Sequence, residues 1–344
     1  MRVSPFLQAL AAAALFGAAA PASKALLGTF APFQLAGLLY LGAALGLLPF
    51  LKPIELDPFR RMDAANRKRL AGAIVSGGIL GPVLLLYGLK LASAASVSLW
   101  LSLELVATAI LGAVFFDDHM GNKASAGALG AVLAAILLAG NEKAAGLEAG
   151  ALVCLACVCW GADNQLTSLI DGATPAQITF WKGLAAGGVN LALGLLTAKW
   201  SAPAGSALWA VAAGAACYGA SIVLYIRASQ RLGATRSQTV FASAPFFGLL
   251  LSASVLGEPI SGIQIAAALM LTASILALCM ERHQHEHDHV AMVHEHAHSH
   301  DDGHHTHPHP DLRPQAVHTH WHEHEALAHS HPHWPDLHHW HGHR

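Results

Sequence analysis

The sequence contains two similar stretches, FGAAAPASKALLG at residues 16–28 and WGADNQLTSLIDG at residues 160–172, which start 144 positions apart. Each begins with an aromatic residue, followed by glycine and alanine, and each ends on glycine. We interpret the pair as the trace of an internal duplication, and this interpretation decides the fold that the sequence predicts.

The similarity continues further along each half of the chain. Pro32 and Gln34 fall over Pro175 and Gln177 at a shift of 143 positions. Further on, LWLSLELVATAILGAVFFDD from position 99 matches TVFASAPFFGLLLSASVLGE from position 239 at a shift of 140, and each stretch ends on an acidic residue. The two halves of the chain are therefore related.

The composition is that of a membrane protein, because 54% of the 344 residues are hydrophobic and only 12% are charged. Soluble domains carry roughly 25% charged residues. Apolar stretches of about 20 residues cross the bilayer as helices, which satisfy their own backbone groups. Polar, proline and glycine breaks divide the sequence into ten such stretches: 5–27, 31–51, 69–91, 94–116, 122–140, 147–169, 176–197, 206–226, 235–256 and 262–280.

Five spans per half is an odd number, so the second half enters the membrane in the opposite orientation to the first. Inverted repeats of this kind build carriers with a central site. We therefore expect an all-α membrane protein of ten helices in two inverted five-helix repeats, 1–141 and 142–281, followed by a histidine-rich tail, 282–344. The pattern favours a transporter over a receptor, and nothing in it indicates an enzyme.

Basic residues set the expected orientation, since cytoplasmic loops are rich in lysine and arginine. The segment KPIELDPFRRMDAANRKRL at 52–70 holds six of them, and Arg227, Arg231 and Arg236 flank a later connection. Both segments lie on the side of the N-terminus. With ten spans, the C-terminal tail is expected on the same, cytoplasmic side.

Three stretches resemble a known family. SLELVATAILGAVFFDDHM at 102–120, SAPFFGLLLSASVLGEPIS at 243–261 and CWGADNQLTSLI at 159–170 are similar to segments of EamA-type carriers of the drug/metabolite transporter superfamily. The resemblance covers about residues 5–280. It implies a secondary carrier of ten helices in the bacterial inner membrane, with both termini in the cytoplasm, which often exports small metabolites without ATP hydrolysis.

The sequence departs from the family pattern in the first repeat. Leu105 stands in place of the family's proline, and Asp117 and Asp118 stand in place of its glycine–glutamate pair. An arginine that is common in the second span is replaced by the nearby Tyr40. The substrate does not follow from the resemblance, because the superfamily carries many solutes.

Placing an ionisable side chain in the hydrocarbon core costs free energy, so such groups usually form ion pairs, face a water-filled cavity or take part in function. Glu104 lies near the middle of the fourth span, where it either couples protons or contacts substrate, or is a neutral, hydrogen-bonded structural group. Asp163 and Lys182 lie at similar depths on consecutive antiparallel spans, each roughly 10 Å from the cytoplasmic end. We therefore predict that Asp163 and Lys182 form an ion pair or share a polar cavity.

Lys24, Asn164 and Trp160 complete the predicted substrate or coupling site, with Gln165, Asn190 and Tyr225 as weaker candidates. Lys24, near the outer end of the first span, either reaches to the membrane surface or binds an anionic substrate. Asn164 and Asn190 either line the pathway or form hydrogen bonds between helices. Trp160 and Tyr225 are aromatic candidates for a cavity wall or for the membrane interface.

The five cysteines all lie in apolar stretches, which disfavours a disulfide framework. Cys154 and Cys157 share a helix face that a soft metal ion could use, although small residues are expected at helix contacts in any case.

The tail is the other chemical feature, since 23 of the 24 histidines follow Arg282. Its low apolar content predicts disorder. Histidines alternate with other residues, and alternate side chains of an extended strand share one side. Neutral imidazoles near pH 7 suit Zn²⁺, Ni²⁺, Cu²⁺ or Co²⁺. The predicted ligands are His285, His287, His289, His294, His296, His298, His300, His318, His320 and His322.

The leading hypothesis is therefore a secondary transporter, expected to export a small metabolite or a metal-related solute, with a tail that binds divalent metal. The alternative is a membrane-anchored metal buffer or sensor with little transport activity. No cofactor is required. The expected partners are membrane lipid, a small-molecule substrate and divalent metal ions; a homodimer stays open. The formal net charge of −2 gives no sign of nucleic acid.

Overall fold

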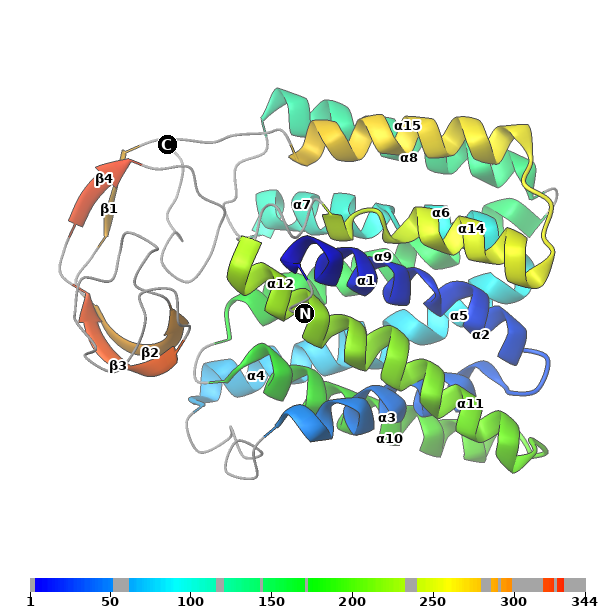
Figure 1. The fold of residues 1–344 in the computed structure, drawn as a ribbon, viewed down its shortest axis with the longest axis horizontal. Coiled ribbons are helices and arrows are strands. Elements are labelled where there is room, and N and C mark those ends of the chain that lie inside the picture. Colours follow the sequence, from blue (N-terminus) through cyan, green and yellow to red (C-terminus); the bar gives the residue numbers. More distant parts are fainter. Residues whose placement is uncertain are drawn as a thin grey trace.

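The structure is a computed structural model, and it describes residues 4–51, 62–115, 121–142, 145–170, 173–232, 240–279, 286–289, 292–298, 318–324 and 327–330. Long helices dominate it and run side by side as a bundle, as Figure 1 shows. The predicted loop residues 52–61 and the predicted family residues Asp117 and Asp118 lie outside the described part.

Seven segments of the described chain are long and apolar enough to cross a membrane. They are α1–α2 (Pro5–Gly17, Ala19–Leu26), α3 with a 3₁₀ turn (Pro32–Leu47, Leu48–Phe50), α4–η3–α5 (Ala64–Ala73, Ile74–Leu80, Gly81–Leu91), α6–α7 (Ala94–Trp100, Leu103–Phe115), α8 (Asn122–Asn141), α9 (Gly146–Ser168) and α11–η5–α12 (Ala204–Gly214, Ala215–Ala220, Ser221–Leu232).

Three more helices complete the bundle. α10 (Pro175–Thr197) has 23 residues but carries Lys182 and Asn190 in its interior. α14 (Ala244–Leu256) and α15 (Gly262–Cys279) are shorter apolar helices. The ten predicted segments thus appear as helices in the described chain, while ten complete crossings stay a prediction.

The third helical segment begins earlier than the sequence predicted. α4 starts at Ala64 because Asp63 caps it, with its side chain accepting a hydrogen bond from the Asn66 backbone N–H at 2.7 Å. The predicted span, 69–91, lies within this longer helical segment, whose polar first turns lack the apolar signal of a span.

Equivalent helices of the two halves, α3 and α10, begin in the same way. Pro32 and Pro175 each occupy the first turn, and the side chains of Gln34 and Gln177 accept hydrogen bonds from the backbone N–H groups of Ala31 and Thr174, at 3.3 and 2.7 Å. The structure therefore confirms the match at a shift of 143 positions as a local structural equivalence.

These two helices also show that the halves are inverted. α3 and α10 pack against each other through glycines: a Cβ on Gly37 would lie 2.5 Å from the Leu191 backbone nitrogen, and one on Gly194 would lie 2.6 Å from that of Gln34. The contact moves three residues back along α3 as it moves three residues forward along α10. Equivalent helices that run antiparallel in this way follow from an inverted repeat.

Irregular helical segments recur at matching positions in both halves. π-helical turns occur at η3 and at η5, which start 141 positions apart. The fourth span of the first half breaks at residues 101–102, between α6 and α7, and its counterpart breaks at residues 242–243, just before α14. The predicted span at 94–116 appears as one apolar helical segment, Ala94–Phe115, with a two-residue turn inside it that the sequence did not predict. Such irregularities mark functional positions more often than chance would place them there.

Four short strands lie among the described residues of the tail. That the tail is disordered without a ligand stays a prediction. β2 (Met292–His298) pairs antiparallel with β3 (His318–His324), and β1 (Glu286–His289) pairs with β4 (Leu327–Ser330). The alternation that we interpreted as a pattern of metal ligands is also the period of a β-strand.

Candidate functional site

A cavity opens beside the two broken helices. Its wall comes from both sides of the two breaks and from α1, α9 and α15. The lining residues are Phe16, Gly17, Ser98, Leu101, Ser102, Glu104, Leu105, Thr108, Asn164, Phe241, Ala242, Ala244, Pro245 and Ile275. The cavity holds about 140 Å³ and is open on one side. This is smaller than the roughly 300–1,000 Å³ that drug-sized ligands occupy, so the cavity suits a small solute.

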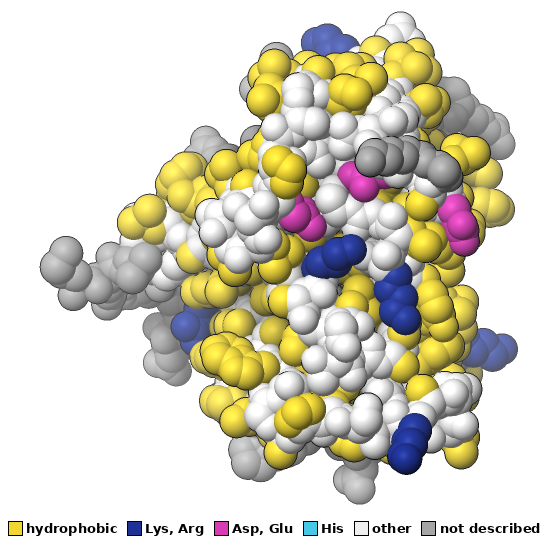
Figure 2. Space-filling model, turned by 90° about the vertical axis from the view of Figure 1, so that its right-hand side faces the viewer, with side chains coloured by type: hydrophobic (Ala, Val, Ile, Leu, Met, Phe, Trp, Pro, Cys, Tyr) yellow, Lys and Arg dark blue, Asp and Glu magenta, His cyan; other side chains and the backbone are white. Residues whose placement is uncertain are grey.

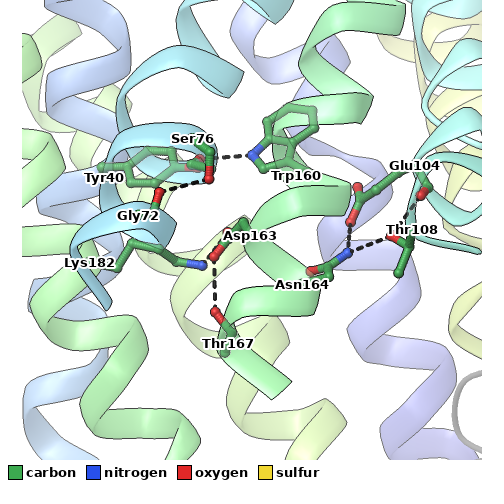
Figure 3. A network of polar contacts seen from close by, with 11 residues as sticks. Tyr40, Gly72, Ser76, Glu104, Thr108, Trp160, Asp163, Asn164, Thr167 and Lys182 are labelled. Atoms are coloured by element: carbon green, nitrogen blue, oxygen red, sulfur yellow. Dashed lines mark hydrogen bonds and ion pairs between the residues drawn. The ribbon is translucent and has the colours of Figure 1, made fainter. Parts of the chain in front are cut away.

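Glu104 supplies the carboxylate of this cavity. Its Oε1 accepts a hydrogen bond from Asn164 Nδ2 at 3.0 Å, and the same amide donates to Thr108 Oγ1 at 3.2 Å (Figure 3). Among the described residues, no hydrogen bond is made to Oε2. The structure therefore brings two predicted site residues, Glu104 and Asn164, together at one wall of the cavity.

The opposite side of α9 carries the predicted ion pair. Lys182 Nζ of α10 lies 2.6 Å from Asp163 Oδ2, and Thr167 Oγ1 donates to Asp163 Oδ1 at 3.0 Å. The side chains of Lys182 and Asp163 are only 18% and 5% exposed. This confirms the predicted ion pair. Figure 3 shows that Asp163 and its neighbour Asn164 point in opposite directions from α9, so this helix separates the ion pair from the cavity.

The π-helical turn η3 supports the ion pair. A Cβ at Gly77 would lie 2.0 Å from Asp163 Oδ2, so only glycine leaves room for the carboxylate here. Because π-helical geometry disturbs the regular hydrogen-bond ladder, the Gly77 carbonyl is available to side chains. It accepts hydrogen bonds from Tyr40 Oη at 2.7 Å and from Trp160 Nε1 at 2.9 Å.

Two candidates from the sequence thus have a packing role. Trp160 is tied to η3 and does not line the described cavity, and Asn190 donates to the Gly78 carbonyl at 3.1 Å. Both residues join α9 or α10 to η3. For Asn190 the structure bears out the reading of a hydrogen bond between helices.

The end of the bundle at the right of Figure 1 is tied together around the turn between α5 and α6, at residues 89–96. Lys24 donates to the carbonyls of Leu89 and Ala92. These are carbonyls at the C-terminus of α5, where a helix favours positive charge. Lys24 is absent from the wall of the described cavity, and a role for it in substrate binding stays a prediction.

The second half of the chain reaches the same turn. Glu258, directly after the left-handed Gly257, accepts hydrogen bonds from the backbone N–H groups of Ala94 and Ala95, both at 2.9 Å. Gln264 Nε2 donates to Ser96 Oγ at 3.0 Å. Figure 2 looks onto this end, where acidic and basic side chains gather near the middle of the face. We call this end of the bundle, where Lys24, Glu258 and Gln264 bind residues 89–96, the closed end.

Glu142 adds a second carboxylate to the closed end. It accepts hydrogen bonds from the backbone N–H and the hydroxyl of Ser93. Burial alone would raise the pKa of Glu142, but these and neighbouring hydrogen bonds outweigh it and hold the pKa below the ordinary value for glutamate. The carboxylate therefore keeps its charge at a pH where a free glutamate takes up a proton.

Several residues at the cavity were missed by the sequence reasoning. Ser102 Oγ is buried and has no hydrogen-bond partner, although Ser102 lines the cavity. Phe16 and Phe241 form its aromatic wall, with ring centroids 5.3 Å apart. The signal that could have found Ser102 and Phe241 is the match between the two fourth spans, since both residues lie at or next to the breaks.

The remaining candidates lie elsewhere. Among residues whose side chains the structure describes, no group of three histidine, cysteine or acidic residues could hold a metal ion, and Cys154, Cys157, Cys159 and Cys217 are free. The predicted ligands His285 and His300 lie outside the described residues. The other eight lie on strands: His287, His289, His294, His296, His298, His318, His320 and His322.

Comparison with known proteins agrees with this architecture. The model of the EamA-like transporter family matches residues 4–140 and 149–280, one segment in each half. A solved structure titled only "Crystal structure of protein" is 19% identical and superposes with a TM-score of 0.55, covering 81% of this chain and 98% of the other. At that identity it supports the fold alone. No curated protein matches the chain.

The family model covers well over half of the chain, and its two segments coincide with the two inverted halves. The helical bundle, the paired breaks and the two family segments thus describe one architecture. The chain belongs to the EamA-like transporter family of the drug/metabolite transporter superfamily, and it is a multi-pass membrane protein.

Proposed function

We propose that this protein is a secondary transporter that exports a small solute by alternating access through the Glu104 cavity. The observation that carries the proposal is the position of this cavity between two broken helices, at residues 101–102 and 242–243, that occupy equivalent places in inverted repeats. In carriers built from inverted repeats, substrate sites form at discontinuous helices at the repeat interface.

The cavity and the closed end lie toward opposite ends of the helices, and therefore toward opposite sides of the membrane. Glu258 and Gln264 belong to the closed end, whereas residues 241–245 and Ile275, on the same two helical segments, line the cavity. Alternating access requires the closed end to separate while the other side closes. Hydrogen bonds between the halves can be exchanged for water in this step at modest net cost.

The distribution of basic residues supports a cytoplasmic location for the open side. The cavity lies toward the end where α15 leads into the tail, and where the basic segment 62–69 and Arg227 also lie. Since loops rich in lysine and arginine stay in the cytoplasm, the described state is open inward. An exporter would load its solute in this state.

The second part of the proposal concerns the tail, which we infer binds a divalent metal such as Zn²⁺, Ni²⁺, Cu²⁺ or Co²⁺. The backbone register of β2 and β3 supports this, because it sets His294 opposite His322 and His296 opposite His320. Residues directly opposite in antiparallel strands are close neighbours. An isolated two-stranded hairpin is marginal in water, so metal binding would stabilise the pairing.

Removal of the tail tests both parts together. We expect cells with a chain ending at Glu281 to keep protein-dependent solute efflux and to lose the metal response, because the cavity lies wholly within the bundle. The measurement compares metal content and exported metabolites, by mass spectrometry, between cells with full-length, truncated and no protein.

A matched variant keeps the tail length and replaces its histidines by asparagine. It should behave as the truncated chain does. If neither variant nor the full chain gives efflux under any condition, and metal tolerance follows the tail alone, the protein is a membrane-anchored metal buffer or sensor.

A further inference from the structure

We infer that the Glu104 cavity takes a monovalent organic cation whose head group carries N–H donors and whose body is apolar. This inference rests on the proposed function and names the substrate class of the same site. It is carried by the charge of the cavity, by two wall oxygens that are open to hydrogen-bond donors and by the apolar surface around them.

The charge of the cavity favours a cation. Glu104 is the one ionisable side chain among the described residues of the wall, and no lysine, arginine or histidine lines it there. The nearest ion pair, Asp163 with Lys182, is internally neutral and lies across α9. A single carboxylate balances a single positive charge, and a desolvated charge needs a partner of opposite sign.

Two oxygen atoms in the cavity wall can accept hydrogen bonds from a bound solute. Ser102 Oγ is buried without a hydrogen-bond partner. The Asn164 amide engages only Oε1 of Glu104, so within the described part of the chain Oε2 is left open to a donor. Asn164 cannot supply more donors, since both hydrogens of its amide are engaged by Glu104 and Thr108. A head group with several N–H donors would satisfy both oxygens at once.

The rest of the wall suits an apolar body. Phe16, Phe241, Leu105, Pro245 and Ile275 form most of it. Aromatic faces also attract cations. A bare divalent metal ion would find one carboxylate and a few hydroxyls, whereas ions such as Ni²⁺ or Zn²⁺ favour nitrogen or sulfur ligands.

Binding to the purified full-length protein in detergent tests the inference. The probe is benzylguanidinium, which is permanently charged and carries N–H donors. Benzylurea has nearly the same shape without the charge, and benzyltrimethylammonium has the charge without N–H donors. We expect benzylguanidinium to bind at least about tenfold more tightly than either analogue, because benzylurea lacks the charge that pairs with Glu104 and benzyltrimethylammonium lacks the N–H donors.

Two variants locate the binding. Glu104→Gln should weaken benzylguanidinium binding by about tenfold to a hundredfold, and Ser102→Ala by about fivefold. Their matched controls are Glu148→Gln and Ser254→Ala, exposed positions on α9 and α14 away from the cavity, which should leave binding unchanged. Circular dichroism of each variant reports whether it is folded.

Equal binding of benzylurea, displacement of benzylguanidinium by Ni²⁺ or Zn²⁺ in the low micromolar range, or unchanged binding by folded Glu104→Gln protein would overturn the inference. The failure of the proposed function looks different. If the protein binds the cation at Glu104 but never exposes the cavity to both sides of the membrane, this inference holds and the proposed transport function fails. If the cavity is exposed to both sides but the cation does not bind, only this inference fails.

Discussion

Glu104→Gln is expected to reduce protein-dependent solute efflux from cells to the level of cells that lack the protein. Glutamine keeps the size of the side chain and still accepts the hydrogen bond from Asn164. It cannot carry a negative charge or exchange a proton. If Glu104 binds the solute or couples its movement to protons, this one change removes the function while the fold survives. Mass spectrometry of the medium, with protein amount checked in the membrane fraction, measures it.

The matched control is Glu148→Gln. Glu148 lies in the first turn of α9, is exposed, and is absent from the wall of the described cavity, so efflux should persist. Unchanged efflux and unchanged dependence on external pH in Glu104→Gln cells would mean that Glu104 is a structural, hydrogen-bonded carboxyl group.

Lys182→Met is expected to lower the free energy of unfolding by about 3–5 kcal/mol, the usual cost of leaving one partner of a buried ion pair alone. The Asp163 side chain cannot move into solvent, because Gly77 packs directly against its carboxylate and Thr167 donates a hydrogen bond to its other oxygen. Thermal unfolding of the purified protein in detergent measures the loss. Lys199→Met, on the exposed loop after α10, is the control and should unfold as the parent does.

The double variant Asp163→Asn with Lys182→Met separates charge from packing. It leaves no uncompensated charge, so most of the lost stability should return. If the double variant is as unstable as Lys182→Met alone, the effect comes from lost packing around α9 and α10, and the ion pair has no special role in stability.

Much of the fold could be predicted because few backbone structures can span the hydrocarbon core of a membrane. In lipid, a helix must satisfy its own backbone groups, so the length of the apolar stretches was enough to predict the helical segments. The odd number of spans per repeat predicted the inversion that α3 and α10 show. The pair Asp163 and Lys182 could also be predicted, since two opposite charges at one depth have little alternative to meeting.

The rest depended on three-dimensional packing that periodicity does not record. The breaks at residues 101–102 and 242–243 carry no proline at the break itself, so nothing local marked them. The availability of the Gly77 carbonyl follows from the π-helical turn, and its partners Tyr40 and Trp160 lie 37 and 83 positions away in the chain. In the tail, alternating histidines fit an extended disordered chain and a strand equally well.

The central claim is that the Glu104 cavity opens to one side of the membrane and then to the other. Ala242→Cys, in a chain whose native cysteines are replaced, places a thiol in the cavity wall. The most direct measurement is its reaction with a membrane-impermeant maleimide in intact cells and in inverted vesicles, with Ser201→Cys, exposed in the loop after α10, as the control for the outer side.

Our account predicts that the Ala242→Cys thiol reacts from the cytoplasmic side, and that Glu258→Gln, which weakens the closed end, makes it react from the outside as well. A thiol that reacts from the cytoplasmic side alone, whether or not the closed end is weakened, would contradict alternating access and leave a bundle that only anchors the tail.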